Sequence, residues 1–426
     1  MTETQQPQEK VITTGISRGQ ENFDYTMQEL AELARANNYE VVGESRQNLD
    51  RSTAGFYFGT GKVEEIAELA RALDATTILV NDELSPSQLR NIEKVTKLHV
   101  IDRTQLILEI FANRAQSKTA KTQVEIAQLQ YALPRLHPSA NKLDQQGGGG
   151  LANRGAGESK LEMDKRVLNK RIARLRQELK DADIGEEVRR QKRLENELPV
   201  VALVGYTNAG KSTTMNGLLD LFSDHPETKQ VFEKDMLFAT LDTSVRQITL
   251  PDHRKFLLSD TVGFVSKLPH KLVDSFKATL AEAANADLLI QVVDYSDPHY
   301  PDMMAVTEKT LQSIGIENIP MIYAFNKADL REDTVYPEVN GNQFVYSARD
   351  AKSLNKLVEL IEGKVFADNE TNTYLIPFAK GSLVDFINRE TGVIATDYTA
   401  DGTKIKTVVN PIQAGQLRPY LLEDAQ

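Results

Sequence analysis

The sequence contains no cysteine and no tryptophan, and it has only six histidines among its 426 residues. The missing cysteine excludes disulfides, cysteine–zinc sites and thiol catalysis. The histidines are scattered without the spacing of metal ligands, so we expect no histidine-held metal. No apolar run approaches the ~20 residues of a membrane span, and the polar start MTETQQPQEK does not resemble a signal peptide. These absences predict a cytoplasmic protein without a membrane span.

The sequence also has fewer basic than acidic residues. The chain has 50 Lys and Arg against 61 Asp and Glu, and its formal net charge is -11. This balance argues against broad, non-specific nucleic-acid binding, although it leaves room for a local basic patch. The length predicts two or three domains, and a hydrophobic content of 40% is enough to build their cores.

The most informative stretch follows the apolar, strand-length run 200–204. Its eight residues, GYTNAGKS, fit G-x-x-x-x-G-K-[ST] at every fixed position, and residues 213–222 have the pattern of a helix. Glycines let the loop turn its backbone N–H groups toward phosphate, and the helix dipole adds positive potential. We expect Lys211 to reach the outer phosphates and Ser212 to ligate magnesium. The candidate nucleotide-binding residues here are Gly205, Tyr206, Thr207, Asn208, Ala209, Gly210, Lys211, Ser212 and Thr213.

Two further motifs flank the next predicted strand, 256–260. Asp260 at its end is expected to hold the water shell of magnesium, and the Gly263 amide is expected to meet the terminal phosphate. Upstream, Thr240 is a candidate second magnesium ligand in the loop 238–242. Lys211, Thr240 and Gly263 are the candidate catalytic residues. The nucleotide-binding candidates in this part are Phe238, Ala239, Thr240, Leu241, Asp242, Asp260, Thr261, Val262 and Gly263.

The last two motifs predict the choice of base. A carboxylate at Asp329 can accept the ring N–H and the exocyclic amine of guanine, whereas adenine offers the opposite pattern. Both motifs follow predicted strands, 321–325 and 344–346, and the carboxyl ends of parallel strands share one crevice. The candidates are Asn326, Lys327, Ala328, Asp329, Ser347, Ala348 and Arg349.

The region before the phosphate loop divides into three parts. Residues 1–10 are predicted to be disordered, and residues 11–144 alternate strands and helices as a small α/β domain with a mostly parallel sheet. Its sequence GTGK at 59–62 is either a glycine-rich turn or an anion contact. Residues 145–198 comprise a glycine-rich loop, which is either a linker or a nucleic-acid contact, and two helices (158–180 and 186–197) that break at Ile184-Gly185. Their dense positive charge favours RNA over a merely solvated surface.

A GTPase domain is predicted for residues 199–366 and a small α+β domain for 367–426. In the latter, residues 381–390 have a helical pattern and residues 392–398 and 404–409 are predicted strands, with a hairpin signal at Asp401-Gly402. The overall prediction is an α/β protein with a parallel-sheet P-loop GTPase domain between the two smaller parts.

Together, GYTNAGKS, FATLD, DTVGF and NKAD resemble the HflX family of translation-factor-class GTPases. The likeness extends through YFGTGKVEE and QVEIAQLQYALPRL of the first domain and covers roughly residues 11–368. It implies a GTPase that uses GTP/GDP and Mg²⁺, acts as a monomer, binds the large (50S) ribosomal subunit and its RNA, and rescues or splits stalled or idle ribosomes under stress. The family's reported ATP binding by the first domain would be a further implication, which no residue here establishes.

One departure from signalling GTPases bears on mechanism. Phe264 stands where many of them place a glutamine that orients the attacking water, so we expect slow intrinsic hydrolysis and activation by an external surface such as the ribosome. A simpler role for Phe264 is to pack beneath the loop that senses the nucleotide. This packing role and the slow hydrolysis are compatible. Two other functions remain open: an RNA- or ribosome-binding scaffold regulated by nucleotide, and an ATP-using RNA-remodelling enzyme.

Overall fold

The computed structural model describes residues 8–136, 153–195, 198–222, 237–238, 244–267 and 283–422. By its internal contacts the chain divides into two compact units. The first comprises Met1–Gln191, Asp235–Asp242 and Phe264–Thr279, and the second comprises Lys192–Lys234, Thr243–Gly263 and Leu280–Gln426. Within the described residues, no helix is both long enough and apolar enough to cross a bilayer.

The first unit contains a four-stranded sheet in the order β2-β1-β3-β4, with every neighbouring pair parallel. Helix α1 packs against α4, and α2 packs against α3. This arrangement confirms the predicted α/β alternation. The elements are β1 (Glu9–Ser17), α1 (Phe23–Ala36), β2 (Tyr39–Asn48), α2 (Thr60–Ala72), β3 (Thr77–Val80), α3 (Pro86–Thr96), β4 (His99–Asp102) and α4 (Arg103–Arg114).

Local signals set several of these boundaries. Ser85 caps α3 by accepting the Gln88 N–H, and Pro86 occupies the first turn. Strand β1 begins at Glu9, so the last two residues of the predicted disordered tail are in fact ordered. Parallel pairing with β2 starts at the same residue, because Glu9 lies opposite Tyr39.

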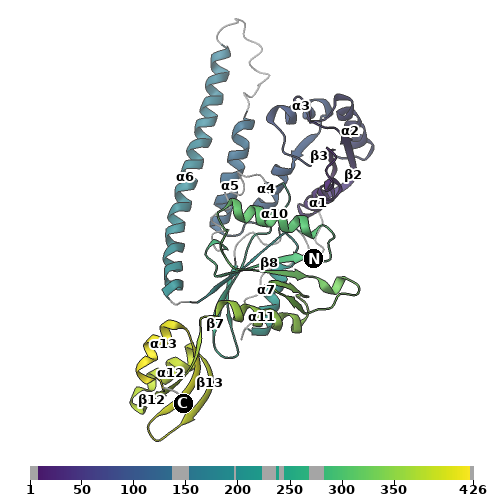
Figure 1. The fold of residues 1–426 in the computed structure, drawn as a ribbon. Coiled ribbons are helices and arrows are strands. Elements are labelled where there is room, and N and C mark those ends of the chain that lie inside the picture. Colours follow the sequence, from purple (N-terminus) through teal and green to yellow (C-terminus); the bar gives the residue numbers. More distant parts are fainter. Residues whose placement is uncertain are drawn as a thin grey trace, which may run out of the picture. The chain divides into compact units, whose positions relative to one another are not determined.

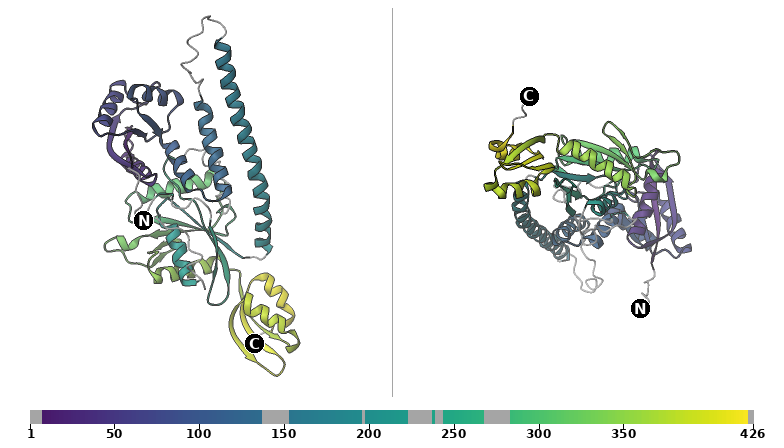
Figure 2. Two further views of the ribbon diagram at one scale, coloured as in Figure 1. Left: turned by 180° about the vertical axis from the view of Figure 1, so that it is seen from behind. Right: turned by 90° about the horizontal axis from the view of Figure 1, so that it is seen from below.

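Two helices follow the sheet in the first unit, α5 (Lys118–Ala132) and α6 (Asn153–Glu195), with the short 3₁₀ turn η1 (Leu133–Arg135) after α5. Figures 1 and 2 show α5 running beside α6, and Ile126 packs there on Ile172 and Leu175. The predicted break at Ile184-Gly185 is wrong, since α6 continues through both residues. A helical glycine is only about 1 kcal/mol less favourable than alanine, which is too little to end a long helix. The helical pair is therefore formed by α5 and α6.

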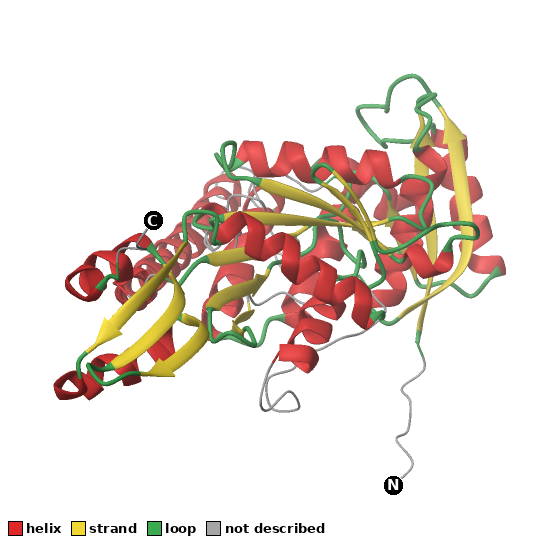
Figure 3. Cartoon of the chain, turned by 60° about the horizontal axis from the view of Figure 1, so that its bottom comes forward, coloured by secondary structure: helices red, strands yellow, loops and turns green. Residues whose placement is uncertain are grey.

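The second unit is built on a seven-stranded sheet in the order β10-β11-β9-β8-β5-β7-β6. Its inner pairs are parallel, whereas β6 and β10 at the edges are antiparallel to their neighbours. Figure 3 shows helices on both sides of these strands. The elements are β5 (Val200–Val204), α7 (Lys211–Phe222), β6 (Ser244–Thr249), β7 (Lys255–Asp260), β8 (Leu288–Asp294), α10 (Tyr300–Ser313), β9 (Met321–Asn326), η4 (Ala328–Leu330), β10 (Glu338–Asn340), β11 (Gln343–Val345) and α11 (Ala351–Val365).

The second unit ends in a small three-stranded antiparallel sheet, ordered β12-β14-β13. Alternate residues of β14 are buried, so one face of this sheet carries the core with Tyr374, Ile387 and Leu417. The sequence correctly predicts the helix and both strands of the hairpin, but it misses the first strand and the last helix. The elements are β12 (Glu370–Ile376), α12 (Gly381–Glu390), β13 (Gly392–Tyr398), β14 (Thr403–Val409) and α13 (Pro411–Leu417).

Candidate functional site

The loop between β5 and α7 lies where the strand order of the large sheet reverses, between β5 and β8, which is the usual ligand position in open α/β sheets. Gly205 (φ 143°) and Gly210 (φ 96°) adopt backbone conformations that other residues rarely reach. A Cβ on Gly205 would lie 2.2 Å from the Val292 carbonyl oxygen, and one on Gly210 would lie 2.1 Å from Asn326 Nδ2. Both positions therefore require glycine for conformation and for space.

Lys211 opens α7 and is almost fully buried. Its Nζ donates to the carbonyl oxygens of Gly205 (3.1 Å) and Tyr206 (2.8 Å), so the ammonium group is folded back under the loop. Burial lowers the pKa of Lys211 to about 8, and the negative charge of Asp260 opposes this shift. A buried cation that opens a helix behind a glycine-bounded loop is the arrangement that receives a polyphosphate.

Ser212 and Asp260 meet beside this lysine. The Ser212 hydroxyl donates to Asp260 Oδ2 at 2.6 Å, and Asp260 is fully buried at the end of β7. A hydroxyl and a carboxylate are hard oxygen donors of the kind that magnesium prefers, so this pair fits a magnesium ion that keeps several of its waters. The described residues include no cluster of three or more His, Asp or Glu that could form an all-protein metal cage.

Gly263 closes over the phosphate loop from the β7 side. A Cβ at this position would lie 2.7 Å from Thr207 Cα and 3.0 Å from Lys211 Nζ. The structure thus brings Gly263, Thr207 and Lys211 together, and Gly263 and Lys211 are the two that the sequence analysis expects to meet the outer phosphates. Thr207 Oγ1 is buried without a hydrogen-bond partner in the described part of the chain, so it is available to a ligand.

Asn326 connects the loops at the carboxyl ends of β5, β9 and β11. Its Nδ2 donates to the Ala209 carbonyl at 2.9 Å, and its Oδ1 accepts the Ala348 N–H at 2.9 Å. These two bonds brace the neighbouring loops against one another. Ala328 N–H also donates to the carbonyl of Tyr346, so the two loops expected to hold the base are bonded directly.

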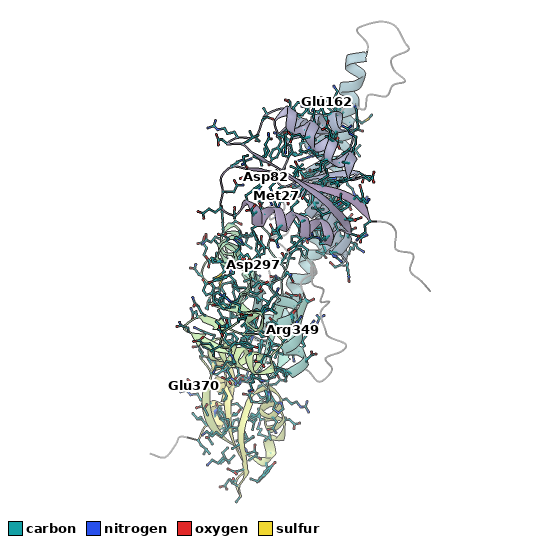
Figure 4. The ribbon with its side chains drawn as sticks, turned by 90° about the vertical axis from the view of Figure 1, so that its right-hand side faces the viewer. Met27, Asp82, Glu162, Asp297, Arg349 and Glu370 are labelled. Atoms are coloured by element: carbon teal, nitrogen blue, oxygen red, sulfur yellow. The ribbon has the colours of Figure 1, made fainter. Side chains whose placement is uncertain are left out.

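The remaining candidates of the base-recognition motifs surround this brace. Asp329 lies exposed in η4, and Lys327 (φ 64°) donates to Asp294 Oδ2 at 2.7 Å. Ser347 is buried and its hydroxyl accepts the Arg349 N–H at 3.3 Å. Figure 4 labels Arg349 in this part of the chain. An exposed carboxylate next to a fixed backbone is suited to pair with the edge of a base.

Some candidates and partners differ from the sequence analysis. Ala239, Thr240, Leu241 and Asp242 lie outside the described residues, and Phe238 belongs to the first unit. The sequence analysis missed Asp294 and Tyr346. Tyr346 is fully buried, and its hydroxyl lies 2.7 Å from Thr214 Oγ1 of α7. Their positions at or beside the carboxyl ends of strands were the signal that could have identified both.

The GTGK sequence of the first unit opens α2. The Gly59 N–H donates to Gln47 Oε1 at 3.0 Å, and Lys62 pairs with Glu65 at 2.8 Å. These contacts favour the glycine-rich turn over an anion site, because the first amide and the lysine already have protein partners.

Three family profiles match consecutive parts of the chain. "GTP-binding GTPase N-terminal" matches residues 24–112, "GTP-binding GTPase Middle Region" matches 114–193, and "50S ribosome-binding GTPase" matches 200–327. A GTP-binding protein of Sulfolobus solfataricus, solved in complex with GDP, is similar at 25% identity over 84% of this chain and 98% of that one, with a TM-score of 0.42.

Several curated relatives carry the name GTPase HflX. The protein of Caldanaerobacter subterraneus subsp. tengcongensis is 38% identical over 422 residues, which are 99% of this chain and 96% of that one. The Flavobacterium psychrophilum protein is 43% identical over 75% of this chain and 76% of its own, and the Escherichia coli protein is 37% identical over 77% and 76%. The chain therefore belongs to the HflX family of GTPases.

Proposed function

We propose that GTP and Mg²⁺ bind at the carboxyl ends of the large sheet. Lys211 and the loop amides would hold the phosphates, Ser212 would ligate the ion, and Asp260 would hold its water shell. Asp329 would select guanine, with Asn326 fixing the loop that carries it. Bound magnesium would neutralise charge that develops on the phosphates during transfer. The convergence of Lys211, Ser212 and Gly263 on one loop carries this assignment.

Hydrolysis by the isolated protein is expected to be slow. Phe264 follows Gly263 and is only 3% exposed, and its side chain offers no hydrogen bond to a water molecule. A partner surface would then have to orient the attacking water, either directly or by moving the residues around Gly263. Two segments would respond to the terminal phosphate: the one that contains Thr240, and the one that begins at Gly263.

The partner that we propose is the large ribosomal subunit and its RNA. The matching profile over residues 200–327 is described as a 50S ribosome-binding GTPase. Helix α6 adds a surface for RNA, because its basic side chains at 165, 166, 170, 174, 176 and 180 are all exposed. In a chain of net charge -11, such a concentration of cations favours a polyanion as partner.

This activity would serve the rescue or splitting of stalled or idle ribosomes under stress, in the cytoplasm. We propose no ATP site in the first unit. The carboxyl ends of β3 and β4 are contacted by Ser266 and Lys267 of the same chain, so protein already occupies this part of the sheet edge.

The deciding experiment is GTP turnover by the full chain, alone and with purified large ribosomal subunits. We expect strong stimulation by the subunits and loss of both rates in Lys211→Ala. Binding of GTP without stimulation would instead favour a scaffold that nucleotide regulates, and preferential binding of ATP in direct competition would overturn the guanine assignment.

The contribution of α6 is tested separately. Replacing Lys165, Arg166 and Lys170 with glutamine should weaken subunit binding and flatten its dependence on salt, because a surface that neutralises fewer phosphates releases fewer counterions. The matched control replaces Lys352, Lys356 and Lys364 of α11. If both triple variants bind equally well, α6 is not the RNA-binding surface.

A further inference from the structure

Helix α4 of the first unit touches two short segments that lie far away in the sequence. Arg103 at its first position hydrogen-bonds to Ser266, and Phe111 near its other end packs edge-to-face on Phe238, with ring centroids 4.6 Å apart. Residues 264–267 follow Gly263 directly, and Phe238 begins the segment that contains Thr240. The segment that follows Gly263 is one that our proposed function assigns to sensing the terminal phosphate.

The contact with Ser266 is buried and uses every polar group of that residue. Its N–H donates to Glu29 Oε1 (3.3 Å), its carbonyl accepts from Arg103 Nε (3.3 Å), and its hydroxyl lies between the Arg103 and Glu29 side chains. Arg103 is 1% exposed and Glu29 is 2% exposed. A buried charged pair is stable only when its remaining hydrogen-bonding groups are satisfied.

All the hydrogen-bond donors of Arg103 have partners only when Ser266 is in place. A guanidinium group has five N–H donors, and here they bond to Thr26 O, Asn81 Oδ1, Glu29, Ser266 O and Ser266 Oγ. Two of the five partners therefore come from residue 266. Undocking the segment would leave two donors of a buried cation unpaired, so the docked position is strongly favoured.

Lys267 adds a second, less buried attachment. Its Nζ donates to the Asn81 carbonyl (3.3 Å) and to Asp82 Oδ1 (2.6 Å), and Asp82 also accepts from the Tyr57 hydroxyl. Figure 4 labels Asp82, which follows β3. Asn81 and Asp82 follow β3 and Arg103 follows β4, so Ser266 and Lys267 lie at the carboxyl ends of these two strands.

We propose that α4 positions the phosphate-sensing segment that follows Gly263 in the GTPase site, with Arg103 as a positioning residue that acts through Ser266. Gly263 lies three residues before this anchor, and its place beside Thr207 and Lys211 is where its N–H can meet a terminal phosphate. Docking on α4 thus prearranges Gly263 for GTP, while GDP gains nothing from it. This inference rests on the proposed phosphate contact of Gly263.

The test measures the affinities of the full chain for a non-hydrolysable GTP analogue and for GDP with fluorescent nucleotides. Ser266→Ala removes the hydroxyl but leaves the Arg103–Glu29 pair and the backbone bonds in place. We expect the analogue to bind about fivefold or more weakly and GDP to bind within about twofold of its original affinity. Ser313→Ala on the exposed surface of α10 is the matched control. An unchanged ratio of the two affinities, or an increased one, overturns the proposal.

Arg103→Lys, alone and combined with Ser266→Ala, tests whether Arg103 acts through Ser266. We expect the two changes to have non-additive effects on the ratio of the affinities for the GTP analogue and GDP, because both remove the same interaction. Additive effects would contradict an action of Arg103 through Ser266. Arg71→Lys on the exposed face of α2 is the matched control.

Gly263→Ala separates the phosphate contact of Gly263, which belongs to the proposed function, from its coupling to α4. If it leaves the ratio unchanged, the phosphate contact itself is wrong, whereas a changed ratio in Gly263→Ala with none in Ser266→Ala disproves only the coupling through α4.

Discussion

Asn326 Nδ2 donates a hydrogen bond to the Ala209 carbonyl oxygen at 2.9 Å, which joins the segment expected to read the base to the loop expected to hold the phosphates. The same side chain accepts the Ala348 N–H. A single amide therefore sets the relative positions of three loops, and both of its hydrogen bonds are made to backbone.

Asn326→Ala should disrupt this arrangement. The change leaves a buried carbonyl and a buried N–H without partners, so we expect the free energy of unfolding to fall by about 2–4 kcal/mol. GTP affinity should fall at least about tenfold, since the loops lose their common brace. Urea unfolding and nucleotide titration measure the two effects. Asn355→Ala, on the exposed face of α11, is the control, and equal losses in both variants would contradict the bracing role.

Gly210→Ala should abolish nucleotide binding and destabilise the second unit by more than about 2 kcal/mol. The new Cβ would lie 2.1 Å from Asn326 Nδ2 at a backbone φ of 96°. Gly315 also has a positive φ (87°), but a Cβ there meets nothing within 4 Å. Gly315→Ala should therefore show only the conformational effect of about 1 kcal/mol. Thermal unfolding and GTP titration of the two variants distinguish crowding from backbone strain.

Asp329→Asn should exchange guanine for xanthine. A carboxylate accepts two N–H groups of guanine, whereas an amide offers one acceptor and one donor. Xanthine has a carbonyl in place of the exocyclic amine and matches the amide. We expect the affinity for GTP to fall by about two orders of magnitude and XTP to become the better ligand, as a competition assay would show. Stability should not change, because Asp329 is exposed. A variant that still prefers GTP would disprove the assigned role.

Asp82→Asn should destabilise the first unit by about 1–3 kcal/mol at neutral pH, because Lys267 loses its ion pair. Burial alone would raise the pKa of Asp82, but the charge and hydrogen bond of Lys267 and the Tyr57 hydroxyl outweigh it and lower the pKa below its usual 3.8. The ionised form is therefore favoured in the fold, and its stabilisation holds above pH ~4 and is lost as the pH falls through the lowered pKa. Urea unfolding of both proteins at pH 7 and near pH 3 should show the difference shrinking in acid. A difference that stays constant over this range would contradict the assignment.

Gly185→Ala should stabilise α6, since the residue lies inside a continuous helix. We expect a gain of about 1 kcal/mol, with a small rise in helical circular dichroism and in the temperature of unfolding. A loss of stability would instead indicate that Gly185 ends a helix, as the sequence pattern first suggests.

The sequence by itself determined the parts of this protein that depend on local spacing. The phosphate loop and the strand ends that carry Asp260 and Asn326 follow from residues a few positions apart. Short-range sterics and hydrogen bonding fix such features, so they can be predicted without knowing the rest of the fold. Strand order and helix α6 needed more. A glycine at 185 weighs little against a long helix, and the inner strand β5 pairs with β7 and β8, which lie far from it in the sequence.

Only the tertiary structure decided where the isolated polar residues lie. Glu29, Arg103 and Ser266 belong to no motif and are up to 237 positions apart, yet they form one buried network. Asp294 likewise meets Lys327 only because β8 and β9 are neighbours in the sheet. Such pairs are selected by desolvation, which makes a buried charge costly unless a partner is at hand, and no local pattern in the chain records which partner the fold will supply.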